Sequence, residues 1–145
     1  MLPVLVVIVL AVLTKKVTIG LLVGYVLVIL GETVLFRTTS SHLHFQPELF
    51  WSYKVWEIQK EQIIANVLAY IPLGLMAGRL WKWKGLFAGI GLSITSEMLQ
   101  LITNRGLCEF DDIANNFLGT LIGVSAYIIC MNLINKKGNN NGLHK

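Results

Sequence analysis

The 145-residue chain is 54% hydrophobic and only 14% charged, with a mean hydropathy of +0.65. A soluble domain usually carries about 25% charged residues, and a chain this short would still need a polar surface in water. The composition therefore argues against a soluble protein and favours a single helical membrane domain over residues 1–145. The net charge of +4 lies in short clusters between apolar runs, which argues against nucleic acid as a partner.

Apolar segments follow one another along the whole chain, at residues 1–13, 17–36, 63–80, 85–102 and 113–134. A spanning helix needs about 20 mainly apolar residues, so the last four have spanning length. The first is short for a span and lacks the basic flank and cleavage site of a signal peptide. We therefore expect an all-α transmembrane bundle of four to five spans, and leave open whether the first segment crosses.

The basic residues predict an orientation, because Lys and Arg collect on the cytoplasmic side of a membrane. Alternate connections hold eight basic residues and no acidic ones: Lys15, Lys16, Arg79, Lys82, Lys84, Lys136, Lys137 and Lys145. We expect a multi-pass membrane protein, with its N-terminus outside and its C-terminus in the cytoplasm. The polar tail 136–145 has nothing to pack and is predicted to be disordered.

The connection over residues 37–62 mixes aromatic and charged side chains, which suits either an interfacial helix or a solvated loop with anchoring aromatics. Its His42 and His44 have no third ligand nearby, so we predict no metal site and no cofactor. Cys108 and Cys130 are predicted to be free thiols, because their expected positions in the helices lie too far apart for a disulfide.

Glycines recur at four-residue spacing in each long segment, and close approach at small residues is what holds helices together in lipid. The pairs are Gly20 and Gly24, Gly74 and Gly78, Gly85 and Gly89, and Gly119 and Gly123. They predict a tightly packed bundle. Pro72 should kink the third segment.

Polar residues in the apolar segments gather at the ends predicted to face outward: Glu32, Asn66, Glu97, Gln100, Asp111, Asp112, Asn115 and Asn116. Glu97 and Gln100 share one helical face, because they are three residues apart. Asp112 shares another with Gly119. A carboxylate within the bilayer costs about 3 kcal/mol, so Glu97 needs a partner, water or a proton. Arg105 is the nearest cation in sequence.

Two interpretations of this cluster stay open. In the first, the polar residues only tie the helices together, through hydrogen bonds of under about 1 kcal/mol each. In the second, they form an outward-facing cleft that binds a headgroup or positions a catalytic acid. Glu97 and Asp112 have the right chemistry for an acid/base pair, although no nucleophile stands out. No histidine lies in an apolar segment, and the sequence has no P-loop.

Three stretches resemble the VanZ-like family of bacterial membrane proteins: NVLAYIPLGL at 66–75, LSITSEMLQ at 92–100 and EFDDIANNFLG at 109–119. The resemblance covers about residues 37–123. Arg105 stands where the family often has a basic residue, and Glu109 where it more often has Asp. The resemblance implies a protein of the cell envelope, accessory to resistance to the glycopeptide teicoplanin, and it does not imply a particular reaction.

The residues and the resemblance together predict a ligand-binding site made of Asn66, Glu97, Gln100, Arg105, Glu109, Asp112 and Asn116. We expect a binding or accessory protein that engages a membrane lipid or lipid-linked envelope precursor at the outer leaflet. The alternatives are an intramembrane enzyme that uses Glu97 and Asp112, and a structural subunit that packs against another membrane protein or a second copy. An apolar cleft beside Glu97 would favour binding or catalysis, whereas close packing of Glu97 on Arg105 would favour a structural role.

Overall fold

The computed structural model describes residues 6–142 apart from residues 8, 11, 39–44 and 47, and it is helical almost throughout. Helix α2 (Lys15–Leu30) runs into a π-helical turn, η1 (Gly31–Leu35). The other helices are α3 (Trp51–Lys54), α4 (Trp56–Trp81), the 3-10 turn η2 (Lys82–Lys84), α5 (Gly85–Thr103) and α6 (Phe110–Gly142). Two short strands, β1 (Phe45–Gln46) and β2 (Cys108–Glu109), pair in parallel with Phe45 opposite Cys108.

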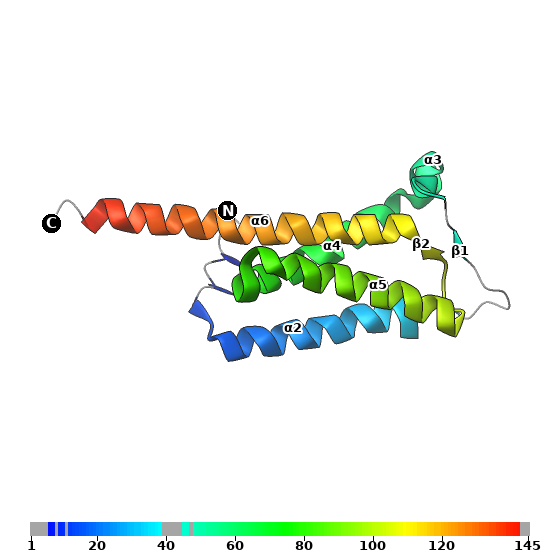
Figure 1. Ribbon diagram of the computed structural model, residues 1–145, viewed down its shortest axis with the longest axis horizontal. Coiled ribbons are helices and arrows are strands. Elements are labelled where there is room, and N and C mark those ends of the chain that lie inside the picture. Colours follow the sequence, from blue (N-terminus) through cyan, green and yellow to red (C-terminus); the bar gives the residue numbers. More distant parts are fainter. Residues whose placement is uncertain (1–5, 8, 11, 39–44, 47, 143–145) are drawn as a thin grey trace.

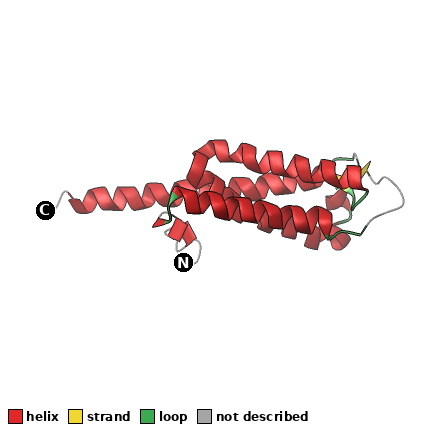
Figure 2. Ribbon diagram, turned by 90° about the horizontal axis from the view of Figure 1, so that it is seen from below, coloured by secondary structure: helices red, strands yellow, loops and turns green. Residues whose placement is uncertain are grey.

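The long helices α2, α4, α5 and α6 lie side by side and alternate in direction (Figures 1 and 2). The short elements α3, β1 and β2 lie at one end of this bundle, and the turn η2 lies at the other. We call the first the acidic end, because Glu97, Glu109, Asp111 and Asp112 lie there, and the second the basic end, after Lys82 and Lys84.

The stretches long and apolar enough to cross a membrane are Lys15–Leu35, Trp56–Thr103 and Phe110–Lys136 within the described residues. The middle stretch folds back at η2, so it supplies two antiparallel helices, α4 and α5. This confirms the all-α fold, and four long helices agree with the predicted number of spans. Residues 1–13 are described only in part, so whether they form a span lies outside the described residues.

Two helices are longer than the apolar pattern predicts. Helix α4 begins at Trp56, seven residues before the predicted start at Ile63, so part of the aromatic connection is helical. Helix α6 continues to Gly142 and projects beyond the bundle in Figure 1. Residues 136–142 of the polar tail thus continue this helix in the structure, and disorder of the tail in solution stays a prediction. Extending a helix that already exists avoids the cost of nucleation, which explains how a polar stretch can remain helical.

Glycines bring α4, α5 and α6 into backbone contact. A Cβ added to Gly119 would lie 2.2 Å from the carbonyl oxygen of Val67, and one added to Gly74 would lie 3.0 Å from the Cα of Gly123. The pairs on these three helices therefore pack as predicted. The pair on α2 does not, since a Cβ on Gly20 or Gly24 would meet no described atom within 4 Å.

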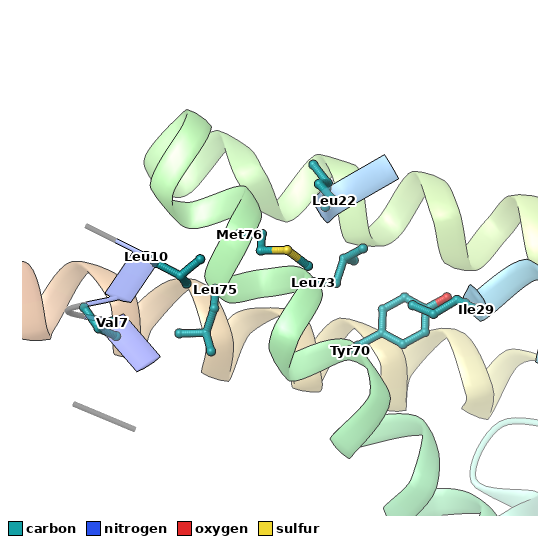
Figure 3. Packing of buried hydrophobic residues seen from close by; sticks show 8 residues of the cluster. All are labelled: Val7, Leu10, Leu22, Ile29, Tyr70, Leu73, Leu75 and Met76. Atoms are coloured by element: carbon teal, nitrogen blue, oxygen red, sulfur yellow. The ribbon is translucent and has the colours of Figure 1, made fainter. Parts of the chain in front are cut away.

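Helix α2 is attached by larger side chains instead of by its glycines. Its Leu22 and Ile29 join a buried cluster with Tyr70, Leu73 and Met76 of α4, and Val7, Leu10 and Leu75 extend this cluster toward the basic end (Figure 3). The Tyr25 hydroxyl donates a hydrogen bond of 2.8 Å to the Ala69 carbonyl. The small-residue pattern alone cannot reveal this second mode of packing, because it depends on shape complementarity between side chains.

Candidate functional site

The two carboxylates suggested as a catalytic pair, Glu97 on α5 and Asp112 on α6, are both buried at the acidic end, each 3% exposed. Gln100, Glu109 and Asn116 of the predicted site are buried there as well. The hairpin geometry explains this gathering: α5 ends where α6 begins, and β2 joins them within a few residues. Five of the seven predicted site residues thus share one buried region.

Asp111 holds the connection from α2 to α4 over this end of the bundle. Its Oδ1 accepts a hydrogen bond of 2.7 Å from the backbone N–H of Phe50, and its Oδ2 accepts one of 2.9 Å from that of Ser52. These N–H groups lie at the start of α3, where an acidic side chain compensates unpaired donors. Asp111 therefore anchors α3, which is a structural role.

Glu109 and Cys108, on strand β2, line the approach to Glu97. The Glu97 Oε2 accepts a hydrogen bond of 3.0 Å from the backbone N–H of Glu109, while the Glu109 Oε2 accepts one of 2.9 Å from the Ser52 hydroxyl. Burial raises the pKa of Glu109 above its ordinary value. Burial, together with the nearby charge of Glu97, raises the pKa of the Cys108 thiol to about 11. Strand β2 is thus a poorly hydrated, acidic segment.

Asp112 and Asn116 point from α6 toward α4 and α5. The Gln62 side-chain amide lies 3.0 Å and 3.3 Å from the two Asp112 oxygens. The Asn116 amide donates a hydrogen bond of 2.9 Å to the Ser93 hydroxyl. Sequence reasoning missed Gln62 and Ser93. Gln62 stands in the polar connection over residues 37–62, where an amide does not stand out, and the single hydroxyl of Ser93 was not counted among the polar residues of the apolar segments.

Arg37 is the cation whose charge acts on the acids, whereas Arg105, the cation nearest to Glu97 in sequence, makes a different contact. Arg105 donates a hydrogen bond to the Leu35 carbonyl and so closes the end of η1. The guanidinium of Arg37 packs against Gly106, where an added Cβ would lie 2.8 Å from its Nη1. Its charge acts on Glu97, Glu109 and Asp112. The η1 turn brings this residue, distant in sequence, to the acids.

Two further residues differ from their expected roles. Glu32, which the sequence placed in the polar cluster, is exposed on η1 and is not part of the buried region. Asn66 is half-buried on α4, and its side-chain nitrogen has no hydrogen-bond partner among the described residues. The cluster is therefore built by α4, α5 and α6, and η1 contributes through Arg37, which follows it.

Several buried polar atoms in this half of the bundle lack a hydrogen-bond partner in the part of the chain that the structure describes: Asn66 Nδ2, Tyr70 Oη, Ser96 Oγ, Gln100 Oε1, Asn115 Nδ2 and Asn116 Oδ1. A buried polar atom without a partner costs about 1–3 kcal/mol. A cluster that only tied helices together would be expected to pair its own groups. Ordered water or polar groups of a ligand would satisfy such atoms.

A groove of about 410 Å³ lies between α5 and α6 beside the acids, and we call it the α5/α6 groove. Its lining residues are Ile94, Glu97, Met98, Leu101, Cys108, Glu109, Phe110 and Ile113. The exposed surface of the groove is apolar, and the carboxyl groups of Glu97 and Glu109 lie buried behind it. The volume falls within the range of about 300–1,000 Å³ found for ligand pockets. This is the apolar cleft beside Glu97 that favours binding or catalysis over a purely structural role.

The described residues contain no group of three or more His, Cys, Asp or Glu side chains placed to hold a metal ion. His42 and His44 lie outside the described residues. Both cysteines, Cys108 and Cys130, are free thiols, as predicted.

Antiparallel apolar helices with buried acids at one end define a polytopic helical membrane protein. The family model VanZ/LLP1 matches residues 4–131, which is most of the chain, and the protein belongs to this family. The resemblance seen in three short stretches is thus confirmed, and it extends beyond residues 37–123 on both sides. Neither the curated proteins nor the solved structures gave a significant match.

Proposed function

We propose that this protein is an accessory binding protein of the bacterial cell envelope, which takes a membrane lipid or lipid-linked envelope precursor at the outer leaflet. The observation that carries the proposal is the α5/α6 groove, an apolar surface with two buried carboxyl groups directly behind its lining. Acids are costly at this depth and mark functional sites in membrane proteins by default.

The groove chemistry indicates what kind of ligand would fit. Ile94, Met98 and Leu101 offer an apolar wall along α5, which suits a hydrocarbon chain. Glu97 and Glu109 are hydrogen-bond acceptors when ionised, and they lie buried behind the apolar lining. Once the lining side chains give way, a headgroup rich in hydroxyl or amine donors would suit them. A phosphate placed directly against them would be repelled, and Arg37 is the cation that would receive it.

We propose further that this binding alters susceptibility to glycopeptides such as teicoplanin. The support is membership of the VanZ/LLP1 family together with the resemblance to VanZ-like proteins. A protein that occupies or displaces lipid-linked precursors would change how much of the glycopeptide target is accessible. This step rests on the groove being a binding site.

The test combines lipid retention with susceptibility. Glu97→Gln should lose co-purifying lipid, detected by mass spectrometry, and should lose any protection against teicoplanin, at unchanged membrane abundance. Glu57→Gln is the matched control, because its carboxylate is exposed and paired with Lys60 at 2.9 Å. A fully active Glu97→Gln protein would disprove a role for this carboxylate as a charged group. Loss of the protein from the membrane would support the structural role instead.

A second pair of variants tests the apolar wall. Met98→Trp would fill the groove, whereas Ile102→Trp adds the same bulk one turn further along α5, at an exposed side chain outside the groove lining. We expect lipid retention to fall only in Met98→Trp. Equal retention in both variants would mean that the groove does not hold a lipid chain.

The alternative function is an intramembrane enzyme that acts on the same class of lipid-linked substrate. It is favoured by the effect of the Asp112 charge on Glu97 and by the unpartnered buried atoms around these two acids, among the described residues. Two interacting carboxylates can divide acid and base roles. Purified protein in vesicles with a lipid-linked substrate would distinguish the two functions. Substrate turnover that is lost in Asp112→Asn would establish catalysis. Substrate that stays intact would support binding without catalysis.

A further inference from the structure

A second pocket lies at the basic end, remote from the acids, and we call it the basic pocket. Its volume is about 280 Å³. It is lined by Arg79, Lys82, Trp83, Tyr127, Ile128, Met131, Asn132 and Asn135. The lining thus combines cations and amide side chains with apolar side chains of α6. Among the described residues, the lining of the α5/α6 groove contains no Lys, Arg, Asn or Gln.

From this arrangement we propose that the basic pocket binds the headgroup of an anionic glycerophospholipid in the leaflet at the basic end. By the orientation predicted above, this is the cytoplasmic leaflet. The inference is independent of the ligand proposed for the acidic end.

Charge is the first argument. Both lining segments, 79–83 and 127–135, lie in stretches of sequence without any Asp or Glu, since no acid occurs at 62–96 or 113–145. The positive charges of Arg79 and Lys82 are therefore not neutralised by neighbours in sequence. Basic pockets between transmembrane helices on the cytoplasmic side are typical sites for anionic headgroups. An anion is the partner that this charge pattern selects.

The way the two cations are held is the second argument. Arg79 donates a hydrogen bond of 3.0 Å from its Nε to the Thr18 hydroxyl and another from its Nη2 to the Leu13 carbonyl. Lys82 has a φ of 53° and a ψ of −134°, a conformation that side-chain-bearing residues seldom adopt. Such strained positions cluster where a ligand is held. Arg79 is thus positioned in advance, and the turn fixes the backbone of Lys82.

The surroundings of the pocket favour a lipid over a free anion. Trp81 and Trp83 are exposed beside it, and exposed tryptophans mark the headgroup level of a bilayer. Ile128 and Met131 supply an apolar floor, which a glycerol backbone and the first acyl carbons could cover and which a free phosphate would leave bare. The volume falls just below the range of about 300–1,000 Å³ for whole ligands, so it suits a headgroup alone.

The experiment uses the purified full-length chain in detergent and counts bound lipid by native mass spectrometry. Phosphatidylglycerol or phosphatidylcholine is added at equal concentration, and a third sample receives millimolar inorganic phosphate with phosphatidylglycerol. We expect preferential retention of phosphatidylglycerol, unchanged by inorganic phosphate. Lys82→Gln should weaken that retention by about fivefold, the share of one basic residue near a membrane surface.

Lys15→Gln is the matched control, because Lys15 is an exposed cation at the start of α2 and does not line the pocket. Asn132→Leu provides a second variant, which keeps every charge and should also weaken retention of phosphatidylglycerol. If Lys82→Gln fails to fold, Asn132→Leu still tests whether the pocket binds the lipid. Equal retention of both lipids, equal losses in Lys82→Gln and Lys15→Gln, or displacement by inorganic phosphate would each overturn the proposal.

Discussion

Both ends of the bundle carry polar groups at the edge of apolar helices, but the two ends accommodate these groups in opposite ways. At the acidic end, Asp111 and Asp112 are buried, and the connection from α2 to α4 folds over them. At the basic end, Lys82 and Lys84 are exposed on a short turn. Long basic side chains can reach water on their own, whereas short carboxylates need donors brought to them. The acidic end therefore depends on tertiary contacts that bring hydrogen-bond donors to its carboxylates, whereas the basic end does not.

The largest expected contrast between the ends is their side of the membrane. In a protein whose Cys108 and Cys130 are replaced by serine, Asn104→Cys should react with an impermeant thiol reagent applied to intact cells, and Lys82→Cys or Lys136→Cys should react only after the cells are opened. The physical reason is the segregation of basic residues on the cytoplasmic side. Labelling of position 82 or 136 in intact cells would reverse the orientation that both ligand proposals assume.

Next in size is the effect of separating the helices that carry the acidic end. Gly119→Leu should abolish stable folding. Even the Cβ of the new side chain would lie 2.2 Å from the Val67 carbonyl oxygen, and the leucine would therefore force α4 away from α6. Leu118→Ala, on the exposed side of the same helix, should change the melting temperature in detergent only slightly. Similar melting temperatures for both variants would place the α4–α6 contact elsewhere.

A smaller effect concerns the reactivity of Cys108. Its pKa of about 11 lies two units above the ordinary value of 9.0, so its thiolate fraction at neutral pH is about a hundredfold lower than that of an ordinary thiol. Native protein should therefore react with N-ethylmaleimide about a hundredfold more slowly at Cys108 than at a cysteine introduced in place of Asn104.

The pH dependence of this reaction has a definite sign. Only the thiolate reacts, so the rate at Cys108 should rise about tenfold per pH unit until the pH approaches its pKa of about 11. Denaturation in SDS should abolish the difference between the two cysteines. Fast labelling of native Cys108 at neutral pH would show that β2 is not buried in an acidic environment.

The smallest expected effect is on the cover of the acidic end. Asp111→Ala removes acceptors for two N–H groups at the start of α3 and should cost about 1–3 kcal/mol. Limited proteolysis should then cut the chain between α2 and α4 faster, while the helical bundle persists. Glu48→Ala is the control, because its carboxylate is exposed and contacts only Lys54 among the described residues. Equal cleavage of both variants would contradict the anchoring role of Asp111.

The sequence by itself determined the fold class, the approximate positions of the apolar helices and the gathering of Glu97, Asp111 and Asp112 at one end. Lipid as solvent imposes long apolar runs, and antiparallel threading puts alternate helix ends on one side. These constraints act locally, so Glu97 and Asp112 could be placed at the same end from their positions in the apolar runs. The packing role of the glycines in α4, α5 and α6 was also predicted from the sequence, because close packing in lipid depends on small residues at regular spacing.

Only the tertiary structure decided which partners the acids have. Ser52 and Arg37 reach the acids from the connection between α2 and α4, and Gln62 reaches them from the second turn of α4. No periodicity in the sequence marks these residues. Sequence proximity favoured Arg105, but the η1 turn after α2 directs Arg37 to the site instead. Helical spacing reports which residues share a face of one helix. The pairing of faces, loops and turns depends on packing across the whole bundle, and that is where the groove and the basic pocket are formed.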